Sequence, residues 1–215
     1  MIRLEISGMP FLYGPHSVGF AGNGPSTAAG AIRRIRALGL GGLNVLDICC
    51  GIGVVGLLIR KELGSNVIAS LALADSNIFN LEAVRATLQL NGWDDDSTII
   101  SFLTDGLMGI PQACQFDLIV SNPPHCAWPD DQALETPSEL GTHDRGWRFH
   151  RQFYERCHDY LRPDGQVWFL ENSATDSEHI SREAIAGNSA LRLLRRYEAR
   201  DDPGFFWMIT ERVCR

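Results

Sequence analysis

The hydrophobic positions from about residue 40 onward alternate between short apolar runs and longer stretches with helical spacing. The apolar runs predict buried strands at Leu43–Ile48, Val67–Ala74, Thr98–Phe102, Phe116–Val120 and Gln166–Leu170. The stretches between them predict helices at Val54–Leu63, Ile78–Leu90 and Arg145–Leu161. Strands that alternate with helices pair in parallel, so the pattern predicts an α/β fold with helices on both faces of the sheet.

The two ends of the chain depart from this alternation. Leu191–Glu198 and Phe205–Val213 flank a short turn, which predicts an antiparallel hairpin at one edge of the sheet. A helix is expected over Ser26–Leu38, with Ser26 or Thr27 as its cap. Residues 1–24 suggest a short strand followed by a glycine-rich flap, and we expect residues 25–215 to form the main domain.

One long segment, residues 123–146, has almost no periodicity. Loops of this length in a compact domain are commonly lids or binding loops, so we expect a lid over a site. A simple surface excursion is the alternative interpretation. The acidic residues of the segment favour cationic amines over phosphates as neighbours.

Composition narrows the choice of partners. The chain has 215 residues and a formal net charge of −7, which argues against a protein that mainly grips nucleic-acid phosphates. Nucleic acid is therefore expected to be an unlikely partner. No apolar window has the length of a membrane span, and the first residues lack a secretory signal. The six cysteines match no zinc signature, so we expect no metal, free thiols and a cytoplasmic location.

Candidate chemistry follows the ends of the first four predicted strands. Asp47 leads into a glycine-rich turn that ends at Gly56, and the next two strands are followed by Asp75 and by Asp105. The fourth strand is followed by Asn122-Pro123-Pro124-His125. The glycine spacing alone also fits a dinucleotide site, but the Asn-Pro-Pro-His sequence has no role in hydride transfer.

Together these motifs resemble the class I S-adenosylmethionine-dependent methyltransferases, in particular their N-methylating branch. The stretch from Val45 to Gly53 is similar to the first motif of that family, and the resemblance extends from about Pro25 to the end of the chain. Residues 116–124, 144–154 and 161–171 are similar to release-factor glutamine and ribosomal RNA guanine-N2 methyltransferases. The resemblance implies a Rossmann-like, doubly wound, mostly parallel seven-stranded sheet and S-adenosyl-L-methionine as the cofactor. The cofactor-binding residues that it implies are Asp47, Cys49, Gly51, Gly53, Asp75, Asp105 and Asn122.

The resemblance also implies catalytic roles for Asn122, Pro123 and His125. Asn122 would accept hydrogen bonds from an amine while the two prolines fix the backbone. His125 is a candidate general base or a second acceptor, although it stands where the family usually has Tyr or Phe. The other departure is Cys49, which replaces a glycine of the first motif. Candidate wall residues of the substrate pocket are Tyr13, His16, Phe20, Trp128, Trp147 and Glu171.

Several reactions fit these residues. The leading hypothesis is N-methylation of an amine or amide nitrogen in a small molecule, amino acid or peptide. A cyclase of the azetidine-2-carboxylate synthase type, which releases methylthioadenosine without methyl transfer, is one alternative. An RNA guanine-N2 methyltransferase is another, and a non-catalytic binding partner is the last. The sequence leaves the oligomeric state open.

Overall fold

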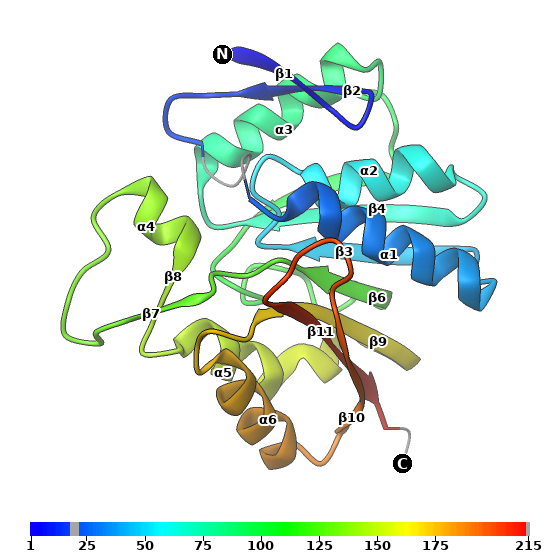
Figure 1. The fold of residues 1–215 in the computed structure, drawn as a ribbon. Helices are drawn as coiled ribbons and strands as arrows, with labels where there is room; N and C mark the ends of the chain where they lie inside the picture. The colour runs from blue at the N-terminus through cyan, green and yellow to red at the C-terminus, as the bar shows by residue number, and fades with distance from the viewer. Residues whose placement is uncertain (18–21, 214–215) are drawn as a thin grey trace.

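A computed structural model describes residues 1–17 and 22–213 of the chain. Its main sheet has seven strands in the order β10-β11-β9-β6-β3-β4-β5 (Figure 1). The strands of this sheet are β3 (Leu43–Ile48), β4 (Ile68–Asp75), β5 (Ile99–Leu103), β6 (Phe116–Ser121), β9 (Leu161–Asn172), β10 (Leu191–Glu198) and β11 (Phe205–Arg212). The pairs from β5 to β9 are parallel, whereas β11 is antiparallel to both β9 and β10. The predicted fold class is confirmed.

Helices cover both faces of this sheet, as expected. On one face lie α1 (Gly24–Leu38), α2 (Val54–Leu63) and α3 (Ile78–Leu90), and on the other lie α5 (Arg148–Arg156), a 3-10 turn (Cys157–Tyr160) and α6 (Ser177–Gly187). Neighbouring residues of a strand point to opposite faces, so Val45 packs in the first core and Leu46 in the second. None of the helices in the described residues is long and apolar enough to cross a membrane.

The beginning of the chain forms a hairpin where one strand and a flap were expected. Strands β1 (Ile2–Ile6) and β2 (Met9–Tyr13) are antiparallel, and the turn between them has positive φ at Ser7 (50°) and Gly8 (69°). Two residues with positive φ give the turn the twist that a two-residue hairpin needs. The hairpin packs on α3, where the backbone N–H of Leu12 donates to the hydroxyl of Thr87 at 2.9 Å.

The predicted lid segment contains regular structure. Strands β7 (Cys126–Trp128) and β8 (His143–Arg145) pair in parallel, and helix α4 (Pro137–Thr142) precedes β8. Figure 1 shows this segment projecting to one side of the sheet. Pairs this short carry no periodicity of their own, which is why the sequence pattern did not reveal them.

Other boundaries differ from the predictions in ways that side-chain contacts explain. Helix α1 begins at Gly24 after Asn23, and neither Ser26 nor Thr27 caps it. Both hydroxyls instead donate back to the carbonyl oxygen of Asn23, at 2.9 and 2.6 Å. Helix α5 begins at Arg148, where the backbone N–H of Phe149 donates to Asp144 at 2.9 Å, and it passes into the 3-10 turn at Cys157, so it is shorter than predicted at both ends.

Candidate active site

A cavity of about 880 Å³ opens where the parallel strands end. It lies where the strand order turns from β3 toward β4 on one side and toward β6 on the other, the usual ligand position in open α/β sheets. Most of the predicted site residues line it. These are Cys49, Gly51, Asp75, Asp105, Asn122, Pro123, His125, Tyr13 and His16.

Asp47 lies beneath the glycine-rich turn, and Gly53 ends that turn as the residue before α2; neither residue is part of the cavity wall. Asp47 is fully buried, and its Oδ2 accepts from the backbone N–H of Gly56 at 2.8 Å. Burial raises the pKa of the Asp47 carboxyl to about 7, opposed by the Gly56 hydrogen bond and assisted by the nearby Asp75 charge. A Cβ atom at Gly56 would lie 2.8 Å from Leu73 and 3.0 Å from the Asp47 carboxylate, so any side chain there would force its neighbours to move.

Cys49 occupies the turn in a strained conformation. Its φ is 57°, a left-handed value that costs a residue with a Cβ about 1–2 kcal/mol. Its side chain lines the cavity, and burial raises the pKa of the thiol well above its usual range, with Asp75 and Asp144 adding to the effect. The thiol is therefore protonated at neutral pH and is a small apolar group in the wall.

Asp75 is held in the cavity wall by three hydrogen bonds. Its Oδ2 accepts from the backbone N–H of Gly51 at 2.8 Å, and its Oδ1 accepts from the backbone of Asn77 at 2.8 Å and the side chain of Asn80 at 3.1 Å. Burial raises the pKa of this carboxyl, and these hydrogen bonds oppose the rise. A carboxylate held in this way can accept both hydroxyls of a ribose. Asp105 lies exposed on the same wall, after β5.

The Asn-Pro-Pro-His sequence follows β6 directly into the cavity. The ring Nε2 of His125 lies 2.9 Å from the side-chain oxygen of Asn122, and Pro123, the residue after Asn122, is buried. With Nε2 donating to that oxygen, Nδ1 of His125 is an acceptor, and it is buried without a hydrogen-bond partner among the described residues. Burial lowers the pKa of His125 to about 4; Glu171 opposes this and His150 adds to it. The ring is therefore neutral at pH 7.

Three residues expected in the substrate pocket lie outside its wall. The ring of Trp128 packs against the ring of His143 in the lid, with 4.8 Å between the ring centroids. The ring of Trp147 is buried against that of His150, with 5.1 Å between the centroids. Glu171 is fully buried beneath the cavity, whereas its neighbour Asn172 lines it, because adjacent strand residues face opposite ways. Phe20 lies outside the described residues.

Glu171 belongs to a buried ionic triad that the sequence analysis did not find. Nδ1 of His150 lies 2.6 Å from Oδ2 of Asp144, and Nε2 lies 3.3 Å from Oε2 of Glu171. Burial by itself lowers the pKa of His150, but the charges and hydrogen bonds of the two carboxylates outweigh it and raise that pKa to about 9. The hydroxyl of Ser181 donates to Glu171 at 2.6 Å. The triad joins the end of the lid to α5, α6 and β9.

The cavity wall also includes residues that no sequence pattern indicated. Phe205 enters from the start of β11, and Arg145 and Arg148 enter from the end of the lid and the start of α5. Neither arginine has an ion pair or a hydrogen bond within the described parts of the chain. The spacing of residues along the chain could not predict the positions of Phe205 or of the two arginines, because these positions depend on which distant segments meet in the fold. No cluster suited to a metal ion occurs among the described residues.

With this geometry in place, comparison with known proteins identifies the family. Residues 38–197 match the family model of the methyltransferase small domain, so the chain belongs to that family. The family is one of methyltransferase domains.

Individual relatives are similar over parts of their length. Ribosomal RNA small subunit methyltransferase C of Pseudomonas aeruginosa (strain UCBPP-PA14) is 29% identical over 134 residues, which are 62% of this chain and 33% of the relative. Release factor glutamine methyltransferase of Fusobacterium nucleatum is 24% identical, over 74% of this chain and 45% of the relative. The chain thus spans less than half the length of these two curated relatives.

A solved structure has the same fold. The 16S rRNA guanine N2 methyltransferase of T. thermophilus, in complex with AdoMet and guanosine, superposes with a TM-score of 0.63. It is 16% identical and covers 99% of this chain and 50% of that one.

These relatives correct one expectation from composition. Nucleic acid was expected to be an unlikely partner, but enzymes named for ribosomal RNA share this domain, so that exclusion is wrong. The net charge of −7 sums over the whole surface and does not describe the cavity, where Arg145 and Arg148 have no ion-pair partner among the described residues.

Proposed function

We propose that this protein transfers a methyl group from S-adenosylmethionine to an exocyclic –NH₂ nitrogen of a nucleobase in RNA. The observation that carries the proposal is the position of Asn122 in the cavity wall, between Pro123 and the ring of His125. An amide oxygen fixed in this way is an acceptor for an –NH₂ group.

The residues around the cavity fit the cofactor. Asp75 would accept the ribose hydroxyls, Asp105 would accept the adenine amino group, and the turn from Cys49 to Gly53 would follow the methionine part. We assign Asp47 to the support of that turn, since its carboxylate accepts from Gly56, and Gly53 to its left-handed last position before α2. When bound, the cofactor supplies a methyl carbon that its sulfonium has already activated. The contribution of the protein is therefore mainly positioning, which can lower a barrier by about 7–11 kcal/mol.

Asn122 would orient the acceptor nitrogen, and His125 would orient the side chain of Asn122. His125 donates to one lone pair of the Asn122 side-chain oxygen and fixes it, and the other lone pair remains for the amine. Pro123 and Pro124 hold the backbone, because each proline fixes its φ. The acceptor nitrogen gains the methyl group and releases one proton. With a pKa of about 4, neutral His125 is a weak base, so we assign it to positioning.

Two features support RNA as the carrier of the amine. The cavity of about 880 Å³ lies near the upper end of the range of about 300–1,000 Å³ for pockets that enclose one small ligand, and it has room beyond the cofactor. The guanidinium groups of Arg145 and Arg148, which pair with no residue that the structure describes, offer charge-assisted contacts to phosphate. The described part of residues 1–24, several of which line the cavity, would act as a cap over it.

The direct test is transfer of radioactive methyl from S-adenosylmethionine to unmodified, in vitro transcribed ribosomal RNA and tRNA. A purified release factor serves as the protein arm, and a reaction without acceptor completes the set. Incorporation into RNA that is lost in Asn122→Ala supports the proposal. Incorporation only into protein contradicts it, and methylthioadenosine formed without any acceptor would instead favour the cyclase.

A further inference from the structure

The ring of Phe205 packs directly against the ring of His125, although the two residues lie far apart in the chain. Its centroid is 5.0 Å from that of His125, with the two ring planes at 70°. Asn172 is its partner in the β9–β11 pairing, and both residues line the cavity. The start of β11 thus brings an aromatic side chain next to Asn122 and His125.

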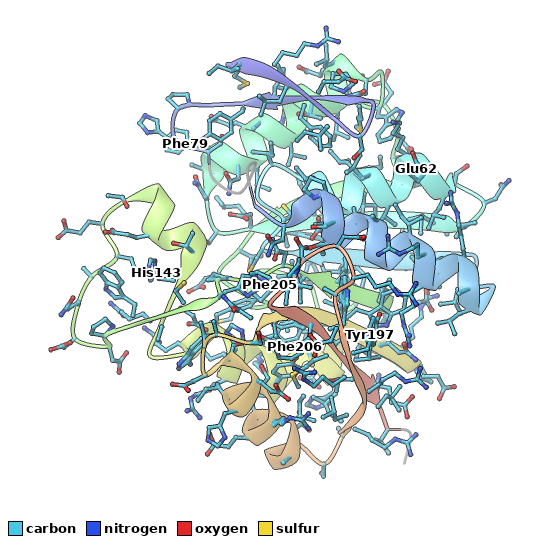
Figure 2. All side chains as sticks on the ribbon, in the orientation of Figure 1. Glu62, Phe79, His143, Tyr197, Phe205 and Phe206 are labelled. Atoms are coloured by element: carbon cyan, nitrogen blue, oxygen red, sulfur yellow. The ribbon has the colours of Figure 1, made fainter. Side chains whose placement is uncertain are left out.

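The surroundings of Phe205 differ from those of the next residue. Phe206 is 0% exposed and belongs to the core, whereas Phe205 is only partly buried and contributes to the cavity wall (Figure 2). Part of an apolar ring therefore remains uncovered in a cavity that also contains charged groups. The uncovered area is the kind of surface on which a planar, apolar group stacks.

The ring of His125 cannot supply the same surface freely. Its Nε2 is bonded to the Asn122 side chain, and its backbone N–H donates to the carbonyl oxygen of Thr142 in the lid at 3.1 Å. These two hydrogen bonds hold His125 as a support for Asn122, and its ring already makes a T-shaped contact with Phe205. Phe205 has no polar atom and is not tied in this way.

We infer that Phe205 is the stacking platform for the planar group that carries the acceptor nitrogen. The inference rests on the proposed function and extends it by naming the residue that sets the plane of the acceptor. An –NH₂ group on a base has its lone pair perpendicular to the ring, so the nitrogen meets the methyl carbon correctly only if the base plane is fixed. Asn122 positions the nitrogen, and Phe205 sets the plane. Phe205 is a positioning residue that also favours large, flat bases over small ones.

The test measures nucleoside binding to protein saturated with S-adenosylhomocysteine, which keeps the nucleosides out of the cofactor site. Guanosine and uridine are titrated calorimetrically into the wild type, Phe205→Leu and Phe205→Tyr. Phe79→Leu is the matched control, because Phe79 is 44% exposed and is not in the cavity wall. Stacking of a base on an aromatic residue is worth enough to expect a loss of about 5- to 30-fold in guanosine affinity for Phe205→Leu. Phe205→Tyr and Phe79→Leu are expected to bind as the wild type does.

The ratio of guanosine affinity to uridine affinity distinguishes a loss of stacking from a general structural effect. Loss of a stacking surface weakens guanosine more than uridine, so the guanosine-to-uridine preference should fall in Phe205→Leu; a general loosening of the cavity would leave it unchanged. If Phe205→Leu fails to fold, Phe205→Met keeps the volume without the flat ring and takes its place. Wild-type affinity or an unchanged preference in these variants overturns the inference, while RNA methylation by the wild type leaves the proposed function standing. A wild type that neither binds nucleosides nor methylates RNA overturns both.

Discussion

Replacing His150 by Gln would remove the cation of the buried triad and leave two carboxylates facing each other. The side chains of His150, Asp144 and Glu171 are 0%, 3% and 0% exposed, so water cannot replace the lost charge. Breaking a buried ion pair by removing one partner costs about 3–5 kcal/mol. The pKa shift of His150, from 6.5 to about 9, gives a similar figure of about 3 kcal/mol. The two calculations of the cost agree, and the expected loss of unfolding free energy is a large part of the stability of an ordinary domain, about 5–15 kcal/mol.

The assay is urea unfolding at pH 6.5, followed by circular dichroism. The adjacent residue provides the matched control: Arg151 pairs with Glu183 at 3.1 Å, but these side chains are 48% and 59% exposed. Arg151→Gln should cost less than about 1 kcal/mol, because exposed ion pairs contribute little. A loss below about 1 kcal/mol in His150→Gln as well would refute the reasoning.

The same triad predicts how stability depends on pH. The pKa of His150 is higher in the folded state (about 9) than its ordinary value of 6.5. Its contribution is therefore fully present below pH 6.5 and is lost as the pH rises through about 9. The unfolding free energy of the wild type and of Arg151→Gln should fall across this window. A flat profile for the wild type would contradict a protonated His150.

Three further predictions concern the site. Asn122→Ala should lower kcat far more than it weakens S-adenosylhomocysteine binding; equal losses, measured by steady-state kinetics and calorimetry, would contradict its role as an amine acceptor. Arg145→Gln and Arg148→Gln should each raise the KM for RNA and lower the salt dependence of binding by about one phosphate contact, whereas Arg200→Gln, outside the cavity wall, should not; equal salt slopes in filter binding would count against these contacts. Gly56→Ala should destabilise the protein by about 1–3 kcal/mol in urea unfolding, because a Cβ there overlaps the core, and wild-type stability would show that the turn can move aside.

Much of the fold could be predicted because its elements depend on local pattern. The bounds of β3, α2 and α3 agree with the prediction, since a buried strand and a one-sided helix each impose a regular spacing of apolar residues. Helix α6 was missed, and so was the pairing of β1 with β2. The β1–β2 turn depends on a positive φ at Ser7, and serine rarely adopts this conformation, so the sequence did not predict the turn.

The site was predictable mainly where its residues stand at strand ends. Asp75, Asp105 and Asn122 follow strands, so the topology alone brings them to one cavity. The roles of Glu171 and Phe205 depend instead on contacts between distant segments, with His150 in one case and His125 in the other. The expectation about nucleic acid failed for a related reason. The net charge does not say where the charged groups lie, whereas the structure places Arg145 and Arg148 in the cavity wall.

The most direct test of the account is the position of the methyl group on its product. Unmodified RNA is incubated with the protein and S-adenosylmethionine, then digested to nucleosides, which are identified by chromatography and mass spectrometry against synthetic standards. The account predicts a nucleoside methylated on its exocyclic nitrogen, formed by the wild type and not by Asn122→Ala. A methyl group on a ring carbon or a ribose oxygen, or an equal yield from Asn122→Ala, would contradict it.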